Sequence, residues 1–503
     1  MQVFENRFPR AVQPHLSLLS RGAAETSAWL TQEDSTRFAA FRIILGLVLL
    51  ADITHLYAHR GLFSSMYPSH LPIAPELILW MIVLVCMIIG YHAQVATIAN
   101  YVCGAFILGV MAPRQGFLQR ASDSVAISLC VLAAVLPCYF MLTVDRFGAG
   151  RRASSTIASA RWLLVGYLSS VYLDSGIHKL KSHIWSAGLG VTTPMSLPSL
   201  VWTSTAWMTW FPAWLLRLSG WGVIAFELLF PALYAWRRTR VVALLTGIAL
   251  HIGIAWVYPI PIFSGLMIAV YAGLLPETWY ARLRQVDKWI ALRGRNANLA
   301  EPPPASQHCL SLRWPAIVMV FWLLCLGVVH SHMSPLRRLQ KVILATTGIN
   351  GYEVFADRLF VPYRYQVRLI PVGETDRAAV PYSRDGLFAW SVRDRLWELW
   401  WKVTQAPWTP VHESELQLAT WAAVYWPLKA APITVRIEAR PQHVELHSVD
   451  PTLFSRNNAV AWQEVGSIQL NGGAVPVTKW IEPPESGEQL LGDYLARVLP
   501  DAH

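Results

Sequence analysis

The sequence predicts an α-helical polytopic membrane protein with a mainly β extramembrane domain at its C-terminal end. Hydrophobic residues make up 54% of the 503 residues and charged residues only 14%, whereas soluble domains have about 25% charged residues. Before residue 335, about eight or nine apolar stretches have the roughly 20 residues needed to cross a bilayer. After about residue 340, apolar and polar residues alternate between turn signals, which is typical of strands.

This pattern divides the chain into three parts. Residues 1–35 form an amphipathic N-terminal segment, 36–335 a transmembrane domain, and 336–503 a β-rich extracytoplasmic domain. Nine membrane spans are expected at about 39–58, 72–91, 94–112, 123–144, 157–178, 213–235, 240–257, 262–277 and 314–332. The Trp-rich segment 183–210 is expected at the membrane interface, where Trp is favoured. In the last domain we expect strands at 363–372, 433–441, 443–449 and 466–472, interrupted by a helix at about 387–405.

The distribution of Lys and Arg predicts the orientation in the membrane. Positive charges gather in the loops after spans four, six and eight, at residues 146–152, 237–240 and 282–295. Such charges accumulate on the cytoplasmic side. The N-terminus is therefore expected in the cytoplasm, and the end of span five and the C-terminal domain outside the inner membrane. Because topology accounts for the formal charge of +10, no nucleic-acid partner is predicted.

Metal and disulfide chemistry have little support in the sequence. The six cysteines lie in or beside the apolar region without a Cys-x-x-Cys pair, so neither a disulfide framework nor a zinc site is expected. Asp52, His55 and His59 share one helix face, but three ligands stacked along one helix rarely close around one ion. A hydrogen bond from Asp52 to another helix is favoured over a metal site. Motifs of nucleotide-binding proteins, zinc proteases and serine hydrolases are absent.

The end of span five, "YLDSGIHKLKSHIW" (172–185), carries an unusual density of ionisable groups. Such residues inside a membrane usually face the bundle interior and mark functional sites. Helical geometry places Asp174 and His178 on one face, with Lys179 about 100° away over Ser175. Burial favours the neutral form of an amine, so Lys179 is a candidate base and His178 a second proton acceptor.

Other polar groups of the membrane region receive less specific interpretations. Lys181 and Trp185 are expected to anchor the helix end at the interface. Glu227 and His251 lie deeper, in spans six and seven. Each is either a satisfied group of the bundle core or a group that faces a substrate.

These residues also carry a family resemblance. Tyr172, Gly176, Lys179, Leu180, Trp185 and Gly188 match the Tyr-x3-Gly-x2-Lys-Leu segment, followed by Trp and Gly, that marks the vitamin K-dependent γ-carboxylase. The segment also resembles that of its bacterial relatives, the horizontally transferred transmembrane (HTTM) domain proteins. "LTVDR" with Asp145, "FELLFP" with Glu227 and "LHIGIAW" with His251 resemble later family landmarks in the same order. The resemblance covers about residues 35–280.

The resemblance implies an integral membrane enzyme with Lys179 as the base. In that family the motif lysine deprotonates reduced vitamin K, and an oxygen-dependent epoxidation drives carboxylation of glutamate in a peptide. Carried over, the cofactor is reduced vitamin K or menaquinol without a metal. The partners are membrane lipid and a secreted or periplasmic peptide. The predicted catalytic residues are Lys179 and His178, and the predicted quinone-binding residues are His251, Glu227, Tyr139, Asp145, Tyr172 and Trp185.

One departure from the family limits what is carried over. The family has Asn-His shortly before its Ser-Val-Asp, where this chain has Tyr139-Phe140. Tyr139 or His251 would then have to contact the quinone oxygen. Quinol chemistry therefore has more support than glutamate carboxylation. The alternative is a non-catalytic membrane protein that binds a lipid or a secreted peptide, for example in toxin maturation or immunity.

Overall fold

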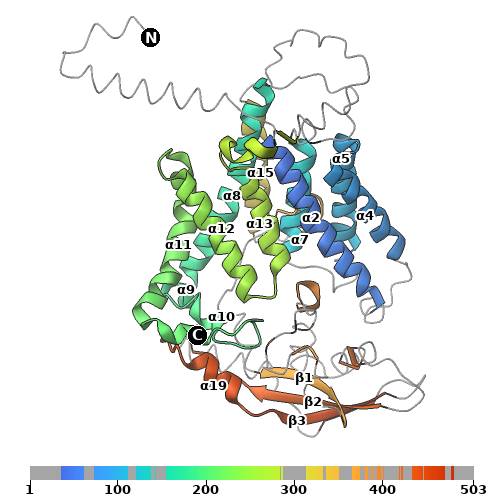
Figure 1. Ribbon diagram of the computed structural model, residues 1–503, viewed down its shortest axis with the longest axis vertical. Helices are drawn as coiled ribbons and strands as arrows, with labels where there is room; N and C mark the ends of the chain where they lie inside the picture. Colours follow the sequence, from blue (N-terminus) through green and yellow to red (C-terminus); the bar gives the residue numbers. More distant parts are fainter. Residues whose placement is uncertain are drawn as a thin grey trace, which may run out of the picture.

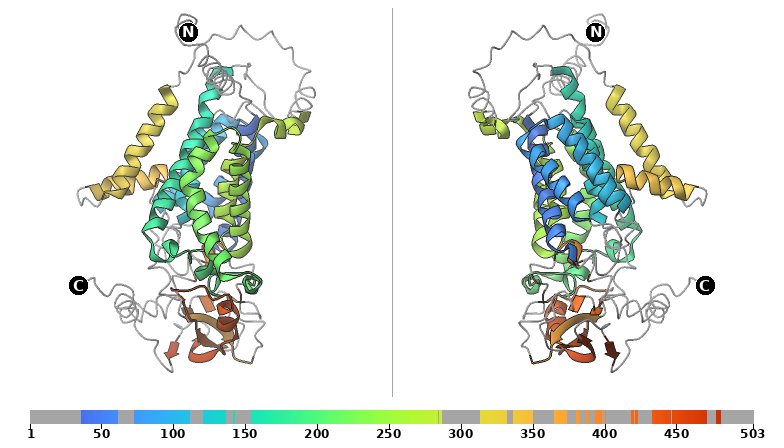
Figure 2. Two further views of the ribbon diagram at one scale, coloured as in Figure 1. Left: turned by 90° about the vertical axis from the view of Figure 1, so that its left-hand side faces the viewer. Right: turned by 90° about the vertical axis from the view of Figure 1, so that its right-hand side faces the viewer.

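The computed structural model shows a helical bundle with a small sheet at one end (Figures 1 and 2). The helical region is described over residues 36–61, 73–111, 121–136, 142, 154–283, 285–286, 313–331 and 336–349. The C-terminal part is described over residues 365–373, 380–382, 387, 389, 393–397, 400, 418–419, 421–422, 433–445, 447–470 and 477–480.

Within the described residues, a helix occupies each segment in which a membrane span was predicted. These helices are α2 (Thr36–Ala58), α4 (Ala74–Ile89), α5 (Ala93–Gly104) with its π-helical continuation η2 (Ala105–Met111), α7 (Ala121–Val135), α8 (Ser154–Lys181), α11 (Ala213–Ala235), α12 (Arg240–Val257), α13 (Pro261–Ala272) and α15 (Arg313–His330). By length and composition, α2, α5 with η2, α11 and α12 can each cross a membrane. The apolar helical segments of α4, α7, α13 and α15 are shorter. The chain therefore has the character of a helical membrane protein.

The outer surface of the bundle supports a lipid environment. Val242 of α12 is 63% exposed, as expected of an apolar side chain that contacts lipid tails. Trp214 at the start of α11 and Trp236 just after its end are 65% and 63% exposed. Trp is enriched at both membrane–water interfaces, so the two tryptophans are placed as a span through a bilayer requires.

Local sequence signals explain where several helices begin and end. The chain leaves α4 at Gly90, whose φ of 75° is the left-handed conformation that glycine adopts without a steric penalty. This turn leads directly into α5, which begins at Ala93. Pro261 begins α13, because proline at the first helical turn loses no hydrogen bond.

Three helices, α8, α11 and α12, pack around one interior space. The fifth predicted span, α8, packs against α11 and α15. In turn, α12 packs against α11 and α13, and α13 against α2. The polar residues predicted as site candidates on α8, α11 and α12 therefore come from neighbouring helices (Figure 1).

The C-terminal part contains a four-stranded antiparallel sheet in the order β1 (Tyr365–Pro371), β2 (Ile433–Pro441), β3 (Gln463–Leu470) and β4 (Val477–Trp480). The predictions of strands at 363–372, 433–441 and 466–472 are confirmed, whereas β4 was not predicted. Leu369 pairs with Ile437 across β1 and β2, and both are fully buried.

The prediction of a strand at 443–449 is wrong. In this segment the backbone groups form hydrogen bonds with side chains instead of with a neighbouring strand. Asn457 of α19 (Leu453–Ala459) accepts a hydrogen bond from the His443 N–H and donates one to the His443 carbonyl. The Glu445 carboxylate accepts from the N–H groups of His447 and Ser448. Alternating polarity alone could not reveal these local hydrogen bonds, which compete with sheet pairing.

Two other segments differ from simple expectation. A helix that was not predicted, α16 (Arg337–Thr347), packs against α7 and η2. Of the helix expected at 387–405, the described residues 395–397 and 400 are helical. The Trp-rich segment forms the short helices α9 (His183–Ser186), α10 (Thr192–Met195) and η3 (Ala206–Trp210). Its residues Leu189, Leu197 and Val201 are buried in a second apolar core, together with Phe454.

Candidate functional site

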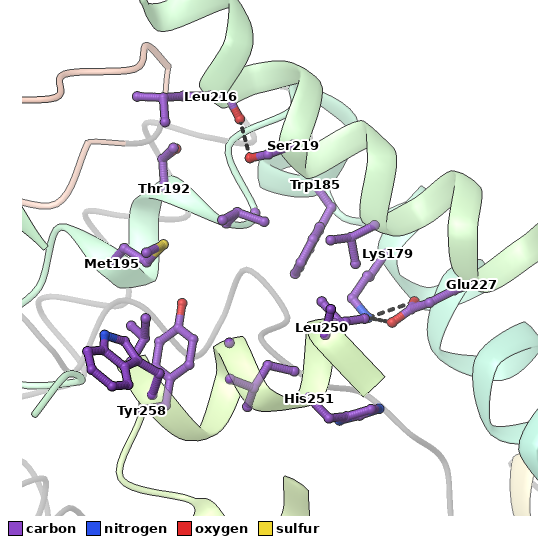
Figure 3. A pocket seen from close by; sticks show the side chains of 18 of the residues that line it. Lys179, Trp185, Thr192, Met195, Leu216, Ser219, Glu227, Leu250, His251 and Tyr258 are labelled. Atoms are coloured by element: carbon purple, nitrogen blue, oxygen red, sulfur yellow. Dashed lines mark hydrogen bonds and ion pairs between the residues drawn. The ribbon is translucent and has the colours of Figure 1, made fainter. Parts of the chain in front are cut away.

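An apolar cavity of about 690 Å³ lies between α8, α11, α12 and α10 (Figure 3). Most of its lining is aliphatic or aromatic, including Val171, Leu216, Ile254 and Phe263. The polar groups that reach it are few: Tyr172, Ser175, Lys179, Thr192, Ser219, Glu227, His251 and Tyr258. A largely apolar pocket with a few convergent polar groups is the usual form of a small-molecule site.

The main polar feature of the cavity is an ion pair between Lys179 and Glu227. The Lys179 Nζ lies 2.6 Å from Glu227 Oε1 and 2.7 Å from Oε2, and donates to Ser175 Oγ at 2.6 Å. Lys179 and Glu227 are each 5% exposed. Figure 3 shows the two side chains meeting at one end of the cavity. The bond to Ser175 confirms the predicted direction of the lysine, and Glu227 is both a satisfied core group and a cavity-lining group.

A close approach of α8 and α11 makes this pair possible. An added Cβ at Gly176 would lie 2.9 Å from Leu228 Cδ2 and 3.4 Å from Glu227 Cβ. No larger residue fits there without moving α11 or its side chains. Gly176 therefore keeps the two helices close enough for Lys179 to reach Glu227.

We expect Gly176→Val to destabilise the protein by about 1–3 kcal/mol, the usual range for an overpacked contact. Gly222→Val on α11 is the matched control, since a Cβ there would meet nothing within 4 Å, and it should change stability little. Thermal unfolding of both variants in detergent measures the difference. Equal unfolding temperatures would contradict the close-contact role of Gly176.

Trp185 forms a second side of the lysine site. Its ring lies 4.9 Å from Lys179 Nζ, within the range of a cation–π contact. Trp185 is only 4% exposed and lines the cavity, so its interpretation as an interface anchor is wrong. The cause is α9, which turns the chain inward after α8. Lys181, by contrast, is exposed.

A hydrogen-bonded chain of three aromatic side chains lies deeper in the bundle. The Tyr172 hydroxyl is 2.9 Å from His251 Nε2 and 2.5 Å from the Tyr271 hydroxyl. His251, Tyr172 and Tyr271 are all buried. Tyr271 was not predicted, although a phenol inside the apolar helix α13 was a detectable signal. Tyr172 and His251 also line the cavity, whereas His251 Nδ1 has no hydrogen-bond partner among the described residues.

The remaining predicted residues lie elsewhere. His178 does not line the cavity; it lies on the face of α8 that packs against α15, where its ring stacks on His330 at a centroid distance of 5.4 Å. Tyr139 and Asp145 lie outside the described residues. The four cysteines in the described part are free thiols.

Asp52 has a partner that the sequence did not suggest. Its Oδ2 accepts a hydrogen bond of 3.0 Å from Arg395, which also binds both carboxylate oxygens of Asp123. Asp52 thus forms an ion pair with the C-terminal part, and Arg395 links it to Asp123 of α7. A direct hydrogen bond from Asp52 to another membrane helix stays a prediction. His59, which shares a helix face with Asp52, has its ring Nδ1 2.9 Å from the His55 carbonyl oxygen.

Comparisons of the chain with protein-family models, with curated proteins and with solved structures gave no match. A functional conclusion therefore depends on the chemistry of the site.

Proposed function

We propose that this protein is a membrane-embedded, γ-carboxylase-like enzyme in which Lys179 deprotonates a quinol of the vitamin K or menaquinol type. The observation that carries the proposal is the buried Lys179–Glu227 pair at one end of a large apolar cavity. The resemblance of the α8 motif to the HTTM family supports the same chemistry.

The cavity has features that suit a quinol with an isoprenoid tail. Its volume of about 690 Å³ is within the usual range for small-molecule sites, about 300–1,000 Å³. Leu218 of α11 and Trp256 of α12 line it and are also 49% and 68% exposed on the outside of the bundle. These exposed lining residues favour entry of an apolar tail from the lipid, between α11 and α12. His251 Nδ1 supplies a further polar atom for the head group.

The ion pair can accept a proton without leaving an isolated charge. With Lys179 as ammonium and Glu227 as carboxylate, the pair has no net charge. Lys179 passes its proton to Glu227 as it takes another from a phenolic hydroxyl of the ligand. An ammonium group then lies against the deprotonated oxygen, with a neutral acid behind it. This arrangement matters because an unpaired charge in an apolar site is costly.

A bound quinol supplies the redox chemistry: with oxygen and carbon dioxide, it becomes the epoxide while a glutamate side chain becomes γ-carboxyglutamate and one water is released. The protein's contribution is to hold the proton acceptor and exclude water. Beside the cavity, Ser199 donates to Gln442 at 2.7 Å, and Asn457 donates to the Ser196 carbonyl at 3.0 Å. The C-terminal part thus lies next to the cavity end formed by α10, where it can present a peptide.

The proposal includes the full predicted topology: eight or nine crossings of the inner membrane, the N-terminus in the cytoplasm, and the C-terminal part outside. Single-cysteine labelling from each side of the membrane tests it. An engineered cysteine at Arg456, which is exposed on α19, should react only from outside.

The direct test of the function is turnover. Purified protein supplied with reduced menaquinone or vitamin K and oxygen should produce the epoxide, detected by mass spectrometry. The same protein given the oxidised quinone is the control and should produce none. Failure to form epoxide from either quinol would overturn the catalytic proposal.

A second candidate function is binding without catalysis. The full engagement of Lys179 by Glu227 and Ser175 favours it, since a satisfied ion pair is also a structural feature. The protein would then bind a lipid or a secreted peptide through the same cavity. Saturable ligand binding without turnover would support this candidate over the enzyme.

A further inference from the structure

A second group of ionisable side chains lies on the face of α8 that packs against α15, about 100° around the helix from Lys179. Asp174 and His178 from α8 meet His330, the last residue of α15. One ligand atom from each residue lies within 4.8 Å of the other two. This cluster is distinct from the quinol site because none of the three residues lines the cavity.

The spacing of the cluster is close to that of a metal site. Asp174 Oδ1 is 2.9 Å from His330 Nε2 and 3.6 Å from His178 Nδ1. Ligands at about 2.0–2.1 Å from a tetrahedral zinc ion lie roughly 3.3 Å from one another. The two measured distances lie on either side of this value. The side chains of His178 and His330 are 22% and 36% exposed, so a metal ion can reach both imidazole rings.

The chemistry of the three groups also fits a cation. Two imidazoles and one carboxylate are ligands for zinc and, as a facial triad, for Fe²⁺. His178 Nδ1 lies 2.9 Å from the Asp174 carbonyl. Neutral imidazole binds metals through Nδ1 or Nε2, so the Nδ1 that faces Asp174 Oδ1 would exchange its contact with this carbonyl for the metal ion.

The position of the cluster in the fold adds an independent reason. His330 ends α15, and His178 lies in the last turn of α8. The C-terminal end of a helix carries a partial negative charge that attracts cations. The C-terminal ends of α8 and α15, each with a partial negative charge, therefore meet at the cluster. The nearby ammonium of Lys179 is paired with Glu227, which reduces its repulsion of a cation.

We propose that Asp174, His178 and His330 form a binding site for a divalent transition-metal ion that joins α8 to α15. The sequence predicted no metal because His330 is far from the other two ligands along the chain. Three protein ligands leave a further coordination position for water or a substrate.

The test is metal content of the full-length protein, purified through a tag without histidines. The protein is stripped with EDTA, loaded with Zn²⁺ and desalted, and its metal is then measured by mass spectrometry. We expect about one zinc per chain in the wild type. Co²⁺ substitution should add the visible absorption bands of a tetrahedral site. Removing even an outer partner of a metal site weakens binding about 10- to 100-fold, so His330→Ala and Asp174→Asn should weaken it at least as much.

His183→Ala is the matched control, because His183 is exposed just after α8 and lies outside the cluster. It should retain the wild-type metal content. Circular dichroism and thermal unfolding establish that the variants are folded. The unfolding temperature of the wild type is a second measurement that needs no variant, since removal of the metal by EDTA should lower it. A wild type that retains no zinc above the level of His330→Ala overturns the proposal, as does a loss of zinc in His183→Ala equal to that in His330→Ala.

Discussion

Replacing Lys179 with Met is expected to reduce quinol-dependent epoxide formation by about 10²- to 10⁴-fold, the usual contribution of a general base. Methionine has a similar length and keeps contact with the ring of Trp185, but it cannot accept a proton. The rate of epoxide formation at saturating quinol measures the effect. Lys181→Met is the matched control, since Lys181 is exposed two residues away, and its rate should be unchanged.

The same substitution also has a structural effect that must be separated from the catalytic one. Without Lys179, the Glu227 carboxylate, which is 5% exposed in the wild type, loses its cationic partner. Breaking a buried ion pair in this way costs about 3–5 kcal/mol. Lost activity in Lys179→Met could therefore result from unfolding alone.

The double variant Lys179→Met with Glu227→Leu resolves this ambiguity. Replacing both partners of a buried ion pair by apolar residues is often neutral or stabilising, so we expect wild-type stability without turnover. Unfolding temperature and epoxide rate are measured on the same sample. A double variant that still makes epoxide would show that neither residue is the base.

The prediction of the membrane helices succeeded where the signal is local. The bounds predicted for α11 and α12 agree with the structure because each is a mainly apolar stretch with charged or proline-containing ends. The direction of Lys179 towards Ser175 also follows from helix geometry alone. Both features depend only on residues within one helix.

The parts that could not be predicted depend on contacts between distant segments. Trp185 has the composition of an interface residue, and only the inward turn at α9 buries it. The bond from Tyr172 to His251 requires α8 and α12 to be neighbours, which the apolar pattern does not specify. His330 and Arg395 contact partners, Asp174 and Asp52, that are more than 150 residues away along the chain.

Arg395→Met is expected to be among the most destabilising single substitutions in the described part of the chain. Arg395 is fully buried, with its Nη2 2.8 Å from Asp123 Oδ1 and 3.0 Å from Asp52 Oδ2. Its loss leaves two carboxylates, from α2 and α7, close together in the bundle without their shared cation. Breaking one buried pair costs about 3–5 kcal/mol, and two pairs share this arginine. Thermal unfolding in detergent measures the loss.

Arg456→Met provides the control, because Arg456 pairs with Asp450 at 2.9 Å but is 61% exposed. An exposed pair contributes about 0–1 kcal/mol, so this variant should unfold close to the wild type. Adding Asp52→Asn and Asp123→Asn to Arg395→Met removes the buried charges and should recover part of the stability. If Arg395→Met unfolded at the same temperature as Arg456→Met, the arginine could not join the C-terminal part to the bundle. If the prediction holds, this charge cluster contributes, beside the hydrogen bonds of Gln442 and Asn457, to joining the C-terminal part to the helical bundle.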